Sequence, residues 1–400
     1  MTSITLTGIG QLVTNASGRP GDLGLIHEAA VAVADGRIAW VGPDSELPDE
    51  HRGVEQITCD GRAVLPGFVD AHTHLIFAGD RSEEFARRLR GESYEEILAA
   101  GGGIHSTVAA TRMASATELA DGAVARLGRM LAGGTTTVEV KSGYGLTTTD
   151  EVRILEAAAE AGRRSQVEVV PTFLGAHVPD KGVDRGEYVD LVVEEMLPAC
   201  APLAQWCDVF CDRGAFTVAD ARRIFAAARE HGLGARIHAE QLSHTGAAAL
   251  AADIGAASAD HLDHATEEDA VMLRAAGVVA VLLPAVSFSM RSPQAPGRML
   301  WDSGVKVALA TDCNPGTSNV ESMPFVIALA CLEMGLTPEE AVWAATRGGA
   351  LALRLDDRGA IVPGALADLV ILDVPSYAHI PYRPGSDPVW RVVKGGEVVA

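Results

Sequence analysis

Short apolar runs alternate with amphipathic stretches through the middle of the chain, and this alternation limits the possible folds more than any other feature. The amphipathic stretches, such as Glu118–Ala132 and Thr149–Arg163, have the apolar spacing of helices. Strands that alternate with helices form parallel βαβ units, and eight such units predict a closed (β/α)₈ TIM-type barrel. The eight runs that we predict to be strands are Val64–His74, Thr135–Gly143, Val167–His177, Cys207–Gly214, Ala235–Glu240, Ala257–His264, Val278–Ala285 and Val305–Asn314.

Both ends of the chain differ from this middle because they are rich in short β-type runs. Asp35-Gly36 separates two such runs and predicts a tight hairpin turn. A barrel takes about 250 residues, so a chain of 400 residues has room for one barrel and a second, smaller unit. We predict an α/β fold in which residues 63–357 form the barrel, while residues 1–62 and 358–400 together form a small β-sandwich-like domain. The terminal runs are Ile4–Leu6, Ala30–Ala34, Ile38–Val41, Ala367–Asp373 and Val389–Val393.

The charge of the chain restricts its partners. Lys and Arg total 32 against 53 Asp and Glu, which gives a formal net charge of −21. Nucleic acids and anionic membranes need a positive binding surface, so we expect neither as a partner. A small anionic substrate is compatible with this charge where a local Arg or Lys binds it.

Cysteine usage and hydropathy indicate the compartment. The six cysteines are scattered, and the N-terminal residues lack the basic segment and apolar core of a secretory signal. No stretch approaches the ~20 apolar residues that span a bilayer. We therefore expect a cytoplasmic protein with reduced cysteines that acts on a small-molecule substrate, and we expect it to be a homodimer.

Side chains that can bind a metal or a substrate stand where the apolar runs end. His72 and His74 end the first run, and alternate residues of a strand face the same side, so both can bind one ion. Such a pair alone is weak evidence, and a closed metal site without catalysis is the competing interpretation. Barrels of this kind place their chemistry at the carboxyl ends of their strands. The candidates at the ends of other runs are Tyr144, His177, His238, His261 and Asp312.

This strand-by-strand pattern resembles the amidohydrolase superfamily over essentially the whole chain. The resemblance implies that His72, His74, His238 and Asp312 bind a metal ion. Binuclear members also carry a bridging lysine or carboxylate at the fourth strand; here that strand ends without such a lysine, and Lys141 ends the second strand instead. We therefore expect one divalent ion per chain, Zn²⁺ or Fe²⁺, with a position left for water.

Several segments, in the right order, resemble the imidazolonepropionase family within that superfamily. The resemblance implies that Arg81 binds the propionate of the substrate, because a planar guanidinium fork matches a carboxylate. A surface ion pair of Arg81 with Glu83 or Glu84 is the alternative. The segments are His74–Phe85, Leu89–Gly91, Ala100–Ile104, Lys141–Leu146, Thr172–Pro179 and Thr311–Thr317.

The same resemblance implies further substrate contacts. Tyr144 and His177 match positions that touch the ring and chain of the substrate. Gln241 stands three residues after His238, where many deaminating relatives have Glu. An amide does not titrate, so Gln241 can orient a substrate but cannot act as its acid or base. The positions that hydrogen-bond substrate or product are Asn314, Gly316 and Thr317.

The implied reaction is the metal-dependent hydrolysis of the ring amide of 4-imidazolone-5-propanoate to N-formimidoyl-L-glutamate. His261, with Asp312 beside the metal, is the candidate that takes the proton of water, and we expect His261 to titrate near its ordinary pKa. Glu240 is a further candidate base, since strand alternation places it on the face of His238. Two alternatives remain open: a deaminase of an aminated heterocycle or formimino compound, and a non-catalytic scaffold.

Overall fold

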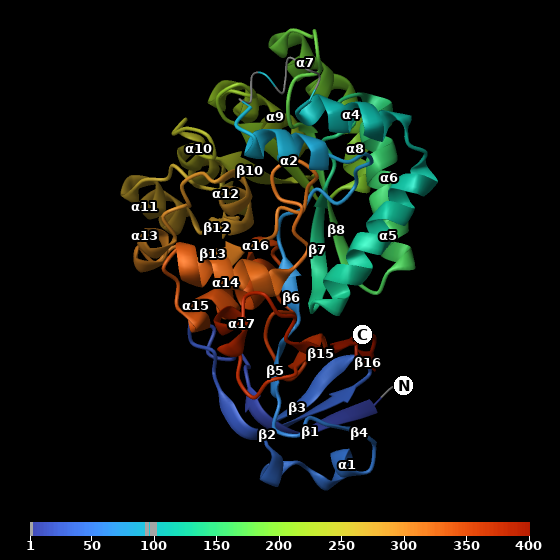
Figure 1. Ribbon diagram of the computed structural model, residues 1–400, viewed down its shortest axis with the longest axis vertical. Helices are drawn as coiled ribbons and strands as arrows, with labels where there is room; N and C mark the ends of the chain where they lie inside the picture. The colour runs from blue at the N-terminus through green and yellow to red at the C-terminus, as the bar shows by residue number, and fades with distance from the viewer. Residues whose placement is uncertain (1–2, 93–95, 97–101) are drawn as a thin grey trace.

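The computed structural model describes residues 3–92, 96 and 102–400, and it contains two sheets (Figure 1). One sheet forms a barrel, and the other is built from the two ends of the chain. The first two residues of the motif Ala100–Ile104 lie outside the described residues.

Eight parallel strands form the barrel and lie side by side in the order in which they occur along the chain. The segments that follow the first and the last strand meet, because Asp312 N donates to His72 O and His74 N donates to Cys313 O, both at 3.0 Å. These bonds close the ring, so the predicted (β/α)₈ barrel is confirmed. The strands are β6 (Phe68–Asp70), β7 (Thr135–Lys141), β8 (Glu168–Ala176), β9 (Trp206–Cys211), β10 (Gly234–Ala239), β11 (Ser258–His261), β12 (Val279–Leu282) and β13 (Val307–Leu309).

Helices cover the outside of the barrel, as Figure 1 shows for α5 (Ala116–Ala132) and α6 (Thr148–Arg164) on one side. Capping residues fix where several of them begin: Ser115 and Thr217 each accept a hydrogen bond from the third helical N–H in a capping box. Among the described helices, none combines the length and the hydropathy that a membrane span requires. The other helices are α1 (Asp49–Arg52), α2 (Ser82–Leu89), α4 (Ile104–Met113), α7 (Arg185–Leu191), α8 (Leu197–Cys200), α9 (Val218–Glu230), α10 (Ala247–Ile254), α11 (Glu267–Ala276), α12 (Pro284–Met290), α13 (Gly297–Asp302), α14 (Met323–Glu333), α15 (Pro338–Trp343), α16 (Gly349–Ala352) and α17 (His379–Tyr382).

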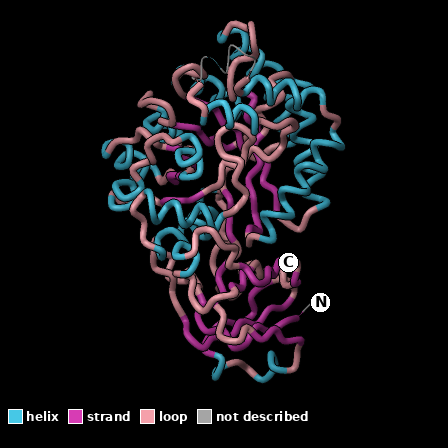
Figure 2. Tube along the Cα trace, viewed as in Figure 1, coloured by secondary structure: helices cyan, strands magenta, loops and turns pink. Residues whose placement is uncertain are grey.

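The second sheet lies at the end of the molecule that holds both chain termini (Figure 2). Its strand order is β16-β15-β14-β5-β1-β2-β3, with β4 paired to β1, so the three strands from the C-terminal end join the N-terminal strands in one sheet through the pairing of β14 with β5. Leu6, Ile9, Val31, Leu369 and Ile371 are buried in its apolar core. The predicted small β-domain built from both termini is therefore confirmed. The strands are β1 (Ser3–Leu12), β2 (Ile26–Ala34), β3 (Arg37–Pro43), β4 (Glu55–Thr58), β5 (Ala63–Pro66), β14 (Leu369–Leu372), β15 (Val389–Lys394) and β16 (Glu397–Val398).

The first predicted barrel strand, Val64–His74, is in fact two strands. β5 pairs with β1 and β14 of the terminal sheet, whereas β6 opens the barrel. Gly67 lies between them; its N–H donates to Asp368 O at 2.8 Å, and a Cβ there would lie 2.3 Å from Thr136 Oγ1. Because both strands are fully buried, both are hydrophobic, and the sequence pattern does not show where one ends and the other begins. We propose the two domains as predicted from the sequence, with the first boundary at Gly67 rather than after residue 62.

Close packing of α16 on β6 generates a stability prediction. Gly349 lies so close to β6 that an added Cβ would be 2.2 Å from Val69 O, and a backbone atom has little freedom to move away. Gly349→Ala should therefore lower the thermal midpoint, at a cost of about 1–3 kcal/mol. Gly128→Ala is the matched control, since Gly128 is exposed in α5 with no such neighbour. That control should stabilise the protein by about 0.5–1 kcal/mol, because Ala loses less backbone freedom in a helix. Equal midpoints for the two variants would contradict this account of the packing.

Candidate metal centre and active site

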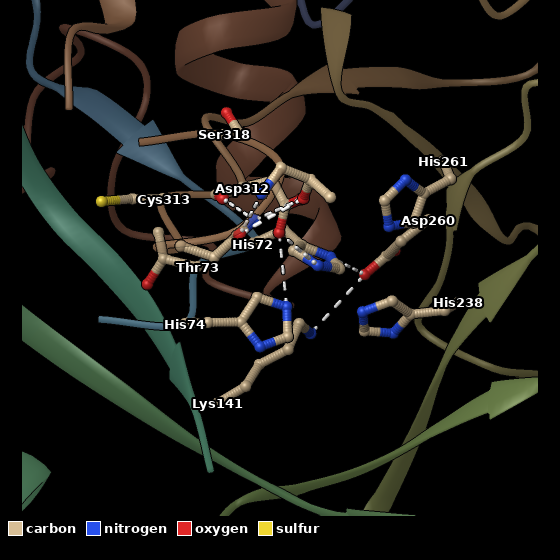
Figure 3. A network of polar contacts seen from close by, with 12 residues as sticks. His72, Thr73, His74, Lys141, His238, Asp260, His261, Asp312, Cys313 and Ser318 are labelled. Atoms are coloured by element: carbon tan, nitrogen blue, oxygen red, sulfur yellow. Dashed lines mark hydrogen bonds and ion pairs between the residues drawn. The ribbon is translucent and has the colours of Figure 1, made fainter. Parts of the chain in front are cut away.

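Four histidines and one aspartate converge where strands β6, β10, β11 and β13 end (Figure 3). His72 and His74 follow β6, His238 lies in β10, His261 ends β11, and Asp312 follows β13. The ring of His72 lies 4.5 Å from that of His238, 5.3 Å from that of His74 and 5.4 Å from that of His261, measured between centroids. All five side chains are at most 3% exposed. The structure thus brings together every predicted metal ligand and the predicted base.

Several polar atoms of this cluster have no hydrogen-bond partner among the described residues, although they are buried. They are His72 Nε2, His74 Nδ1, His238 Nε2, His261 Nδ1 and Asp312 Oδ1. Asp312 Oδ1 lies 3.5 Å from His72 Nε2 and 3.3 Å from His74 Nε2. Buried polar atoms without partners are costly, and a cation among them would satisfy several at once. Imidazole and carboxylate donors in this number suit Zn²⁺ or Fe²⁺, so the residues present fit a divalent metal.

Two carboxylates orient the histidines, and neither was predicted from the sequence. His72 Nδ1 lies 2.7 Å from Asp260 Oδ2, and His238 Nδ1 lies 3.0 Å from Asp208 Oδ1. An ionised carboxylate accepts from the Nδ1–H tautomer, which leaves the lone pair of Nε2 free to bind a metal. The available signal was a charged residue inside an apolar barrel strand, as in Trp206–Cys211 and Ser258–His261.

Lys141 contacts both of these carboxylates and that of Glu139; Figure 3 shows it beside Asp260. Its Nζ lies 2.7 Å from Asp208 Oδ2, 2.8 Å from Glu139 Oε1 and 3.7 Å from Asp260 Oδ2, and none of the four side chains is exposed. Burial alone would lower the pKa of Lys141, but the carboxylates of Asp208 and Glu139 outweigh it and raise the pKa above its ordinary value. Lys141 is therefore protonated, and its ammonium group forms ion pairs with these carboxylates beneath the histidines.

Asn314 shapes the loop that carries Asp312. Its Nδ2 donates to Asp312 O at 2.7 Å and to Asp312 Oδ2 at 3.0 Å, while its Oδ1 accepts from the N–H groups of Gly316 and Thr317, both at 2.8 Å. The amide is therefore already bonded within the loop. Burial raises the pKa of Asp312 to about 7.

His177 and Tyr144 form one wall of the site beside His74. The ring of His177 stacks on that of His74, with centroids 5.0 Å apart and 21° between the planes. The ring of Tyr144 lies 5.8 Å from His74 and 5.5 Å from His177. Burial raises the pKa of Tyr144, so its hydroxyl stays protonated and able to donate.

Arg81 forms an ion pair with Glu84, the alternative that the sequence left open. Its Nε donates to Glu84 Oε2 at 3.1 Å and its Nη2 donates to Glu84 Oε1, with both side chains about one-tenth exposed. The remaining edge faces the loop after Asp312, since a Cβ on Gly316 would lie 2.1 Å from Arg81 Nη1. Arg81 thus contacts the predicted substrate-binding loop while it is paired with Glu84.

Glu240 does not face the metal cluster, contrary to the expectation from strand alternation. β10 ends at Ala239, and Glu240 turns away with a φ of 54°. Its carboxylate accepts from the N–H groups of Thr245, Gly246 and Ala248 at the start of α10. The backbone N–H of Gln241 donates to Asp212 at 2.9 Å, and its side-chain amide makes no hydrogen bond within the described part of the chain.

His261 departs from its expected ionisation. Burial, with His238 beside it, lowers the pKa of His261 well below its ordinary value, so the expectation of an ordinary pKa is wrong. Its Nδ1 makes no hydrogen bond among the described residues, and the nearest carboxylate oxygen, Asp263 Oδ2, lies 3.9 Å away. The imidazole is therefore neutral near pH 7 and able to accept a proton or to bind a metal.

Comparisons with known proteins agree with this geometry. The model of the amidohydrolase family matches residues 63–399, and a model of the imidazolonepropionase-like composite domain of bacteria matches residues 29–53. The imidazolonepropionase of Salinispora arenicola is 52% identical over 99% of this chain and 98% of its own length. That of Streptomyces coelicolor is 52% identical over 97% of this chain and 98% of its own. The solved structure of an adenosine deaminase from Xanthomonas campestris with bound zinc has a TM-score of 0.75 at 19% identity, covering 99% of this chain and 92% of that one.

The chain belongs to the amidohydrolase family, because the family model spans most of its length. Its full-length relatives place it among the imidazolonepropionases of that family, as the six sequence segments predicted. The adenosine deaminase, at its low identity, shows only that the fold is shared.

The buried position of Lys141 generates a second prediction. Lys141→Met leaves Asp208 without the ammonium and Glu139 with only the more distant guanidinium of Arg236, at 3.7 Å. Removal of one partner from a buried ion network typically costs about 3–5 kcal/mol. The midpoint of urea unfolding should fall accordingly. Lys306→Met is the matched control, because the same chemical change is made at an exposed side chain with no ion pair among the described residues. A Lys141→Met variant as stable as the control would show that the network does not depend on the ammonium.

Proposed function

We propose that this site hydrolyses the ring amide of 4-imidazolone-5-propanoate to N-formimidoyl-L-glutamate, the activity of an imidazolonepropionase. The observation that carries the proposal is the identity of about half of all residues, over essentially the full chain, to relatives with that name. The relatives do not favour the deaminase or the non-catalytic scaffold, and the cluster of buried, unsatisfied histidine nitrogens supplies the means of hydrolysis.

We propose that one divalent ion, Zn²⁺ or Fe²⁺, is held by His72, His74, His238 and Asp312. When bound, such an ion polarises the ring carbonyl and lowers the pKa of water. The unsatisfied atoms of these four residues support the proposal. A single ion is supported by Lys141, whose ammonium group already lies between Asp208 and Glu139.

The proton transfers are assigned to His261, with Asp312 as the other candidate. Water adds to the ring carbonyl carbon, the carbon–nitrogen bond breaks, and the leaving nitrogen takes up a proton. The neutral imidazole of His261 accepts the proton of water and returns it to that nitrogen. Glu240 is not proposed in this role, because three backbone N–H groups occupy its carboxylate.

The substrate is held by residues around the mouth of the barrel. Arg81 binds the propionate, in exchange for part of its pairing with Glu84. Tyr144 and His177 pack on the ring, as their places beside His74 support. Gln241, Asn314, Gly316 and Thr317 orient the substrate or product, with Asn314 acting through the loop that it shapes.

We further propose that the protein works in the cytoplasm as a homodimer on this small molecule. Six free cysteines, five of them buried, support a reducing compartment. We expect a homodimer, and light scattering of the purified protein tests this by measuring its molar mass in solution.

The activity and its metal dependence are tested together. Freshly prepared 4-imidazolone-5-propanoate should lose its ring absorbance in the presence of the protein. Chelator treatment should abolish this, and Zn²⁺ or Fe²⁺ should restore it, because no side chain replaces the ion. Elemental analysis should find about one ion per chain. Substrate that stays intact with the fully loaded protein would refute the proposed reaction, and two tightly held ions would refute the single-metal site.

His261→Asn separates the base from the metal ligands. This variant should keep its metal while kcat falls by about 10²–10⁴-fold, the usual contribution of a general base. His238→Ala, in contrast, should lose metal. Because the pKa of His261 is lowered, the parent protein should lose activity on acidification only below pH ~6.5. The pH–rate profile of the variant should lack this acidic decrease. Equal metal loss in both variants would make His261 a ligand.

Arg81→Met tests substrate binding. Loss of the charge-assisted pair with the propionate should cost roughly 2–4 kcal/mol in kcat/KM. Arg90→Met is the matched control, because Arg90 pairs with Glu83 at the exposed side of the same segment. If the two variants retain equal kcat/KM, Arg81 is only the partner of Glu84.

A further inference from the structure

A cavity of about 500 Å³ is lined by Arg81 and by the predicted substrate loop. Its walls come from the segment that follows His74, from α2, α5 and α12, and from the loop that follows Asp312. Four arginines line it, and we call it the arginine cavity; they are Arg81, Arg88, Arg126 and Arg129. Such a concentration of cations is unexpected in a chain with a net charge of −21.

Two of these arginines are already neutralised. Arg129 donates to both oxygens of Glu321, at 2.6 and 2.7 Å, and Arg81 is paired with Glu84. One further carboxylate, that of Asp80, lines the cavity, and it accepts from Ser82 N at the exposed start of α2.

The other two arginines, Arg88 and Arg126, have no carboxylate partner among the described residues. Arg126 donates to the carbonyl oxygens of Leu75 at 3.0 Å and Phe77 at 3.4 Å, and its guanidinium lies 3.5 Å from the centroid of the Phe77 ring. The polar contact of Arg88 is with the sulfur of Met290. A guanidinium has five N–H donors, so each keeps donors that can face the cavity.

Both uncompensated cations are half-buried, and this has an electrostatic cost. Burial lowers the pKa of Arg88 and of Arg126 from the ordinary value for arginine. An anion in the cavity would offset that cost and would accept the remaining N–H groups as charge-assisted hydrogen bonds. Two guanidinium groups without partners in one cavity match two carboxylates better than one.

We propose that the arginine cavity binds a small dicarboxylate, and that its occupant is the product on its way out. Identification of the occupant rests on the proposed function. Hydrolysis of the ring amide converts a substrate with one carboxylate into a product with two, so the second carboxylate appears in the step that must be followed by release. Arg81 and Gly316 line the cavity and also belong to the proposed substrate site, so the two spaces adjoin.

Calorimetry on the metal-loaded protein tests the proposal without turnover. Glutarate, a stable dicarboxylate with the carbon chain of the product, should bind about tenfold more tightly than pentanoate, the monocarboxylate of equal length. Arg88→Met and Arg126→Met should each remove that preference. Arg90→Met should keep it, because Arg90 does not line the cavity and is paired with Glu83 at an exposed position. Since Arg126 also supports the chain after His74, Arg126→Lys and the thermal midpoint of each variant control for misfolding.

The outcomes are distinct. An unchanged glutarate preference in both Arg88→Met and Arg126→Met overturns the proposal, because glutarate then binds at the metal or at Arg81. Phosphate that binds as tightly as glutarate also overturns it, since the cavity is then a general anion site. Glutarate binding does not depend on hydrolysis of the imidazolone. If the proposed function is wrong, the glutarate measurement still tests whether the cavity binds a dicarboxylate. Only the identification of the occupant as the product would then be lost.

Discussion

The buried ion network around Lys141 is the constraint on which the rest of the site depends. Its ammonium contacts carboxylates from three alternate strands of the barrel, its own among them, and two of those carboxylates orient the rings of His72 and His238. Buried ion pairs are seldom more stabilising than apolar residues of equal size, because their desolvation is costly. The network is better explained by orientation: a carboxylate that stays ionised fixes the Nδ1–H tautomer and leaves Nε2 toward the metal position. Stability and function are thereby linked in one set of charges.

Only a closed barrel brings these charges together. Glu139 and Lys141 lie on β7, Asp208 on β9 and Asp260 on β11, far apart in the sequence. Parallel strands place all their carboxyl ends at one mouth, so the charged layer lies directly beneath the histidines. The ring closes through backbone bonds between the segments that carry His72, His74 and Asp312. The segments of the proposed ligands are thus part of the closure, which couples the geometry of the candidate metal site to the integrity of the barrel.

The elements that could be predicted from sequence are those that depend on local pattern. Strand alternation with helices predicted the barrel, and polar residues at strand ends predicted His72, His74, His238, His261 and Asp312. Features that depend on pairing between distant segments were not predicted. Asp208 and Asp260 each look like a lone charge in an apolar strand, and their role appears only when the histidines lie opposite them. Glu240 was misplaced because alternation assumes that a strand continues, whereas a positive φ ends β10 one residue earlier. The expectation of an ordinary pKa for His261 was also wrong. Burial among other rings lowers that pKa, and such burial is a property of the folded site that local sequence does not show.

An acidic chain can bind an anionic substrate because the local pairing of its arginines, rather than its net charge, determines what an anion meets in the cavity. At physiological ionic strength, charges more than about 8 Å apart are largely screened, so the net charge of the molecule has little influence inside a lined cavity. What an anion meets there is decided by which arginines are already paired. Glu84 and Glu321 neutralise Arg81 and Arg129, and both pairs can be opened by a competing carboxylate only at the cost of that pairing. Arg88 and Arg126 carry no such cost, because neither has a carboxylate partner among the described residues, so an anion in the cavity meets these two guanidinium groups first.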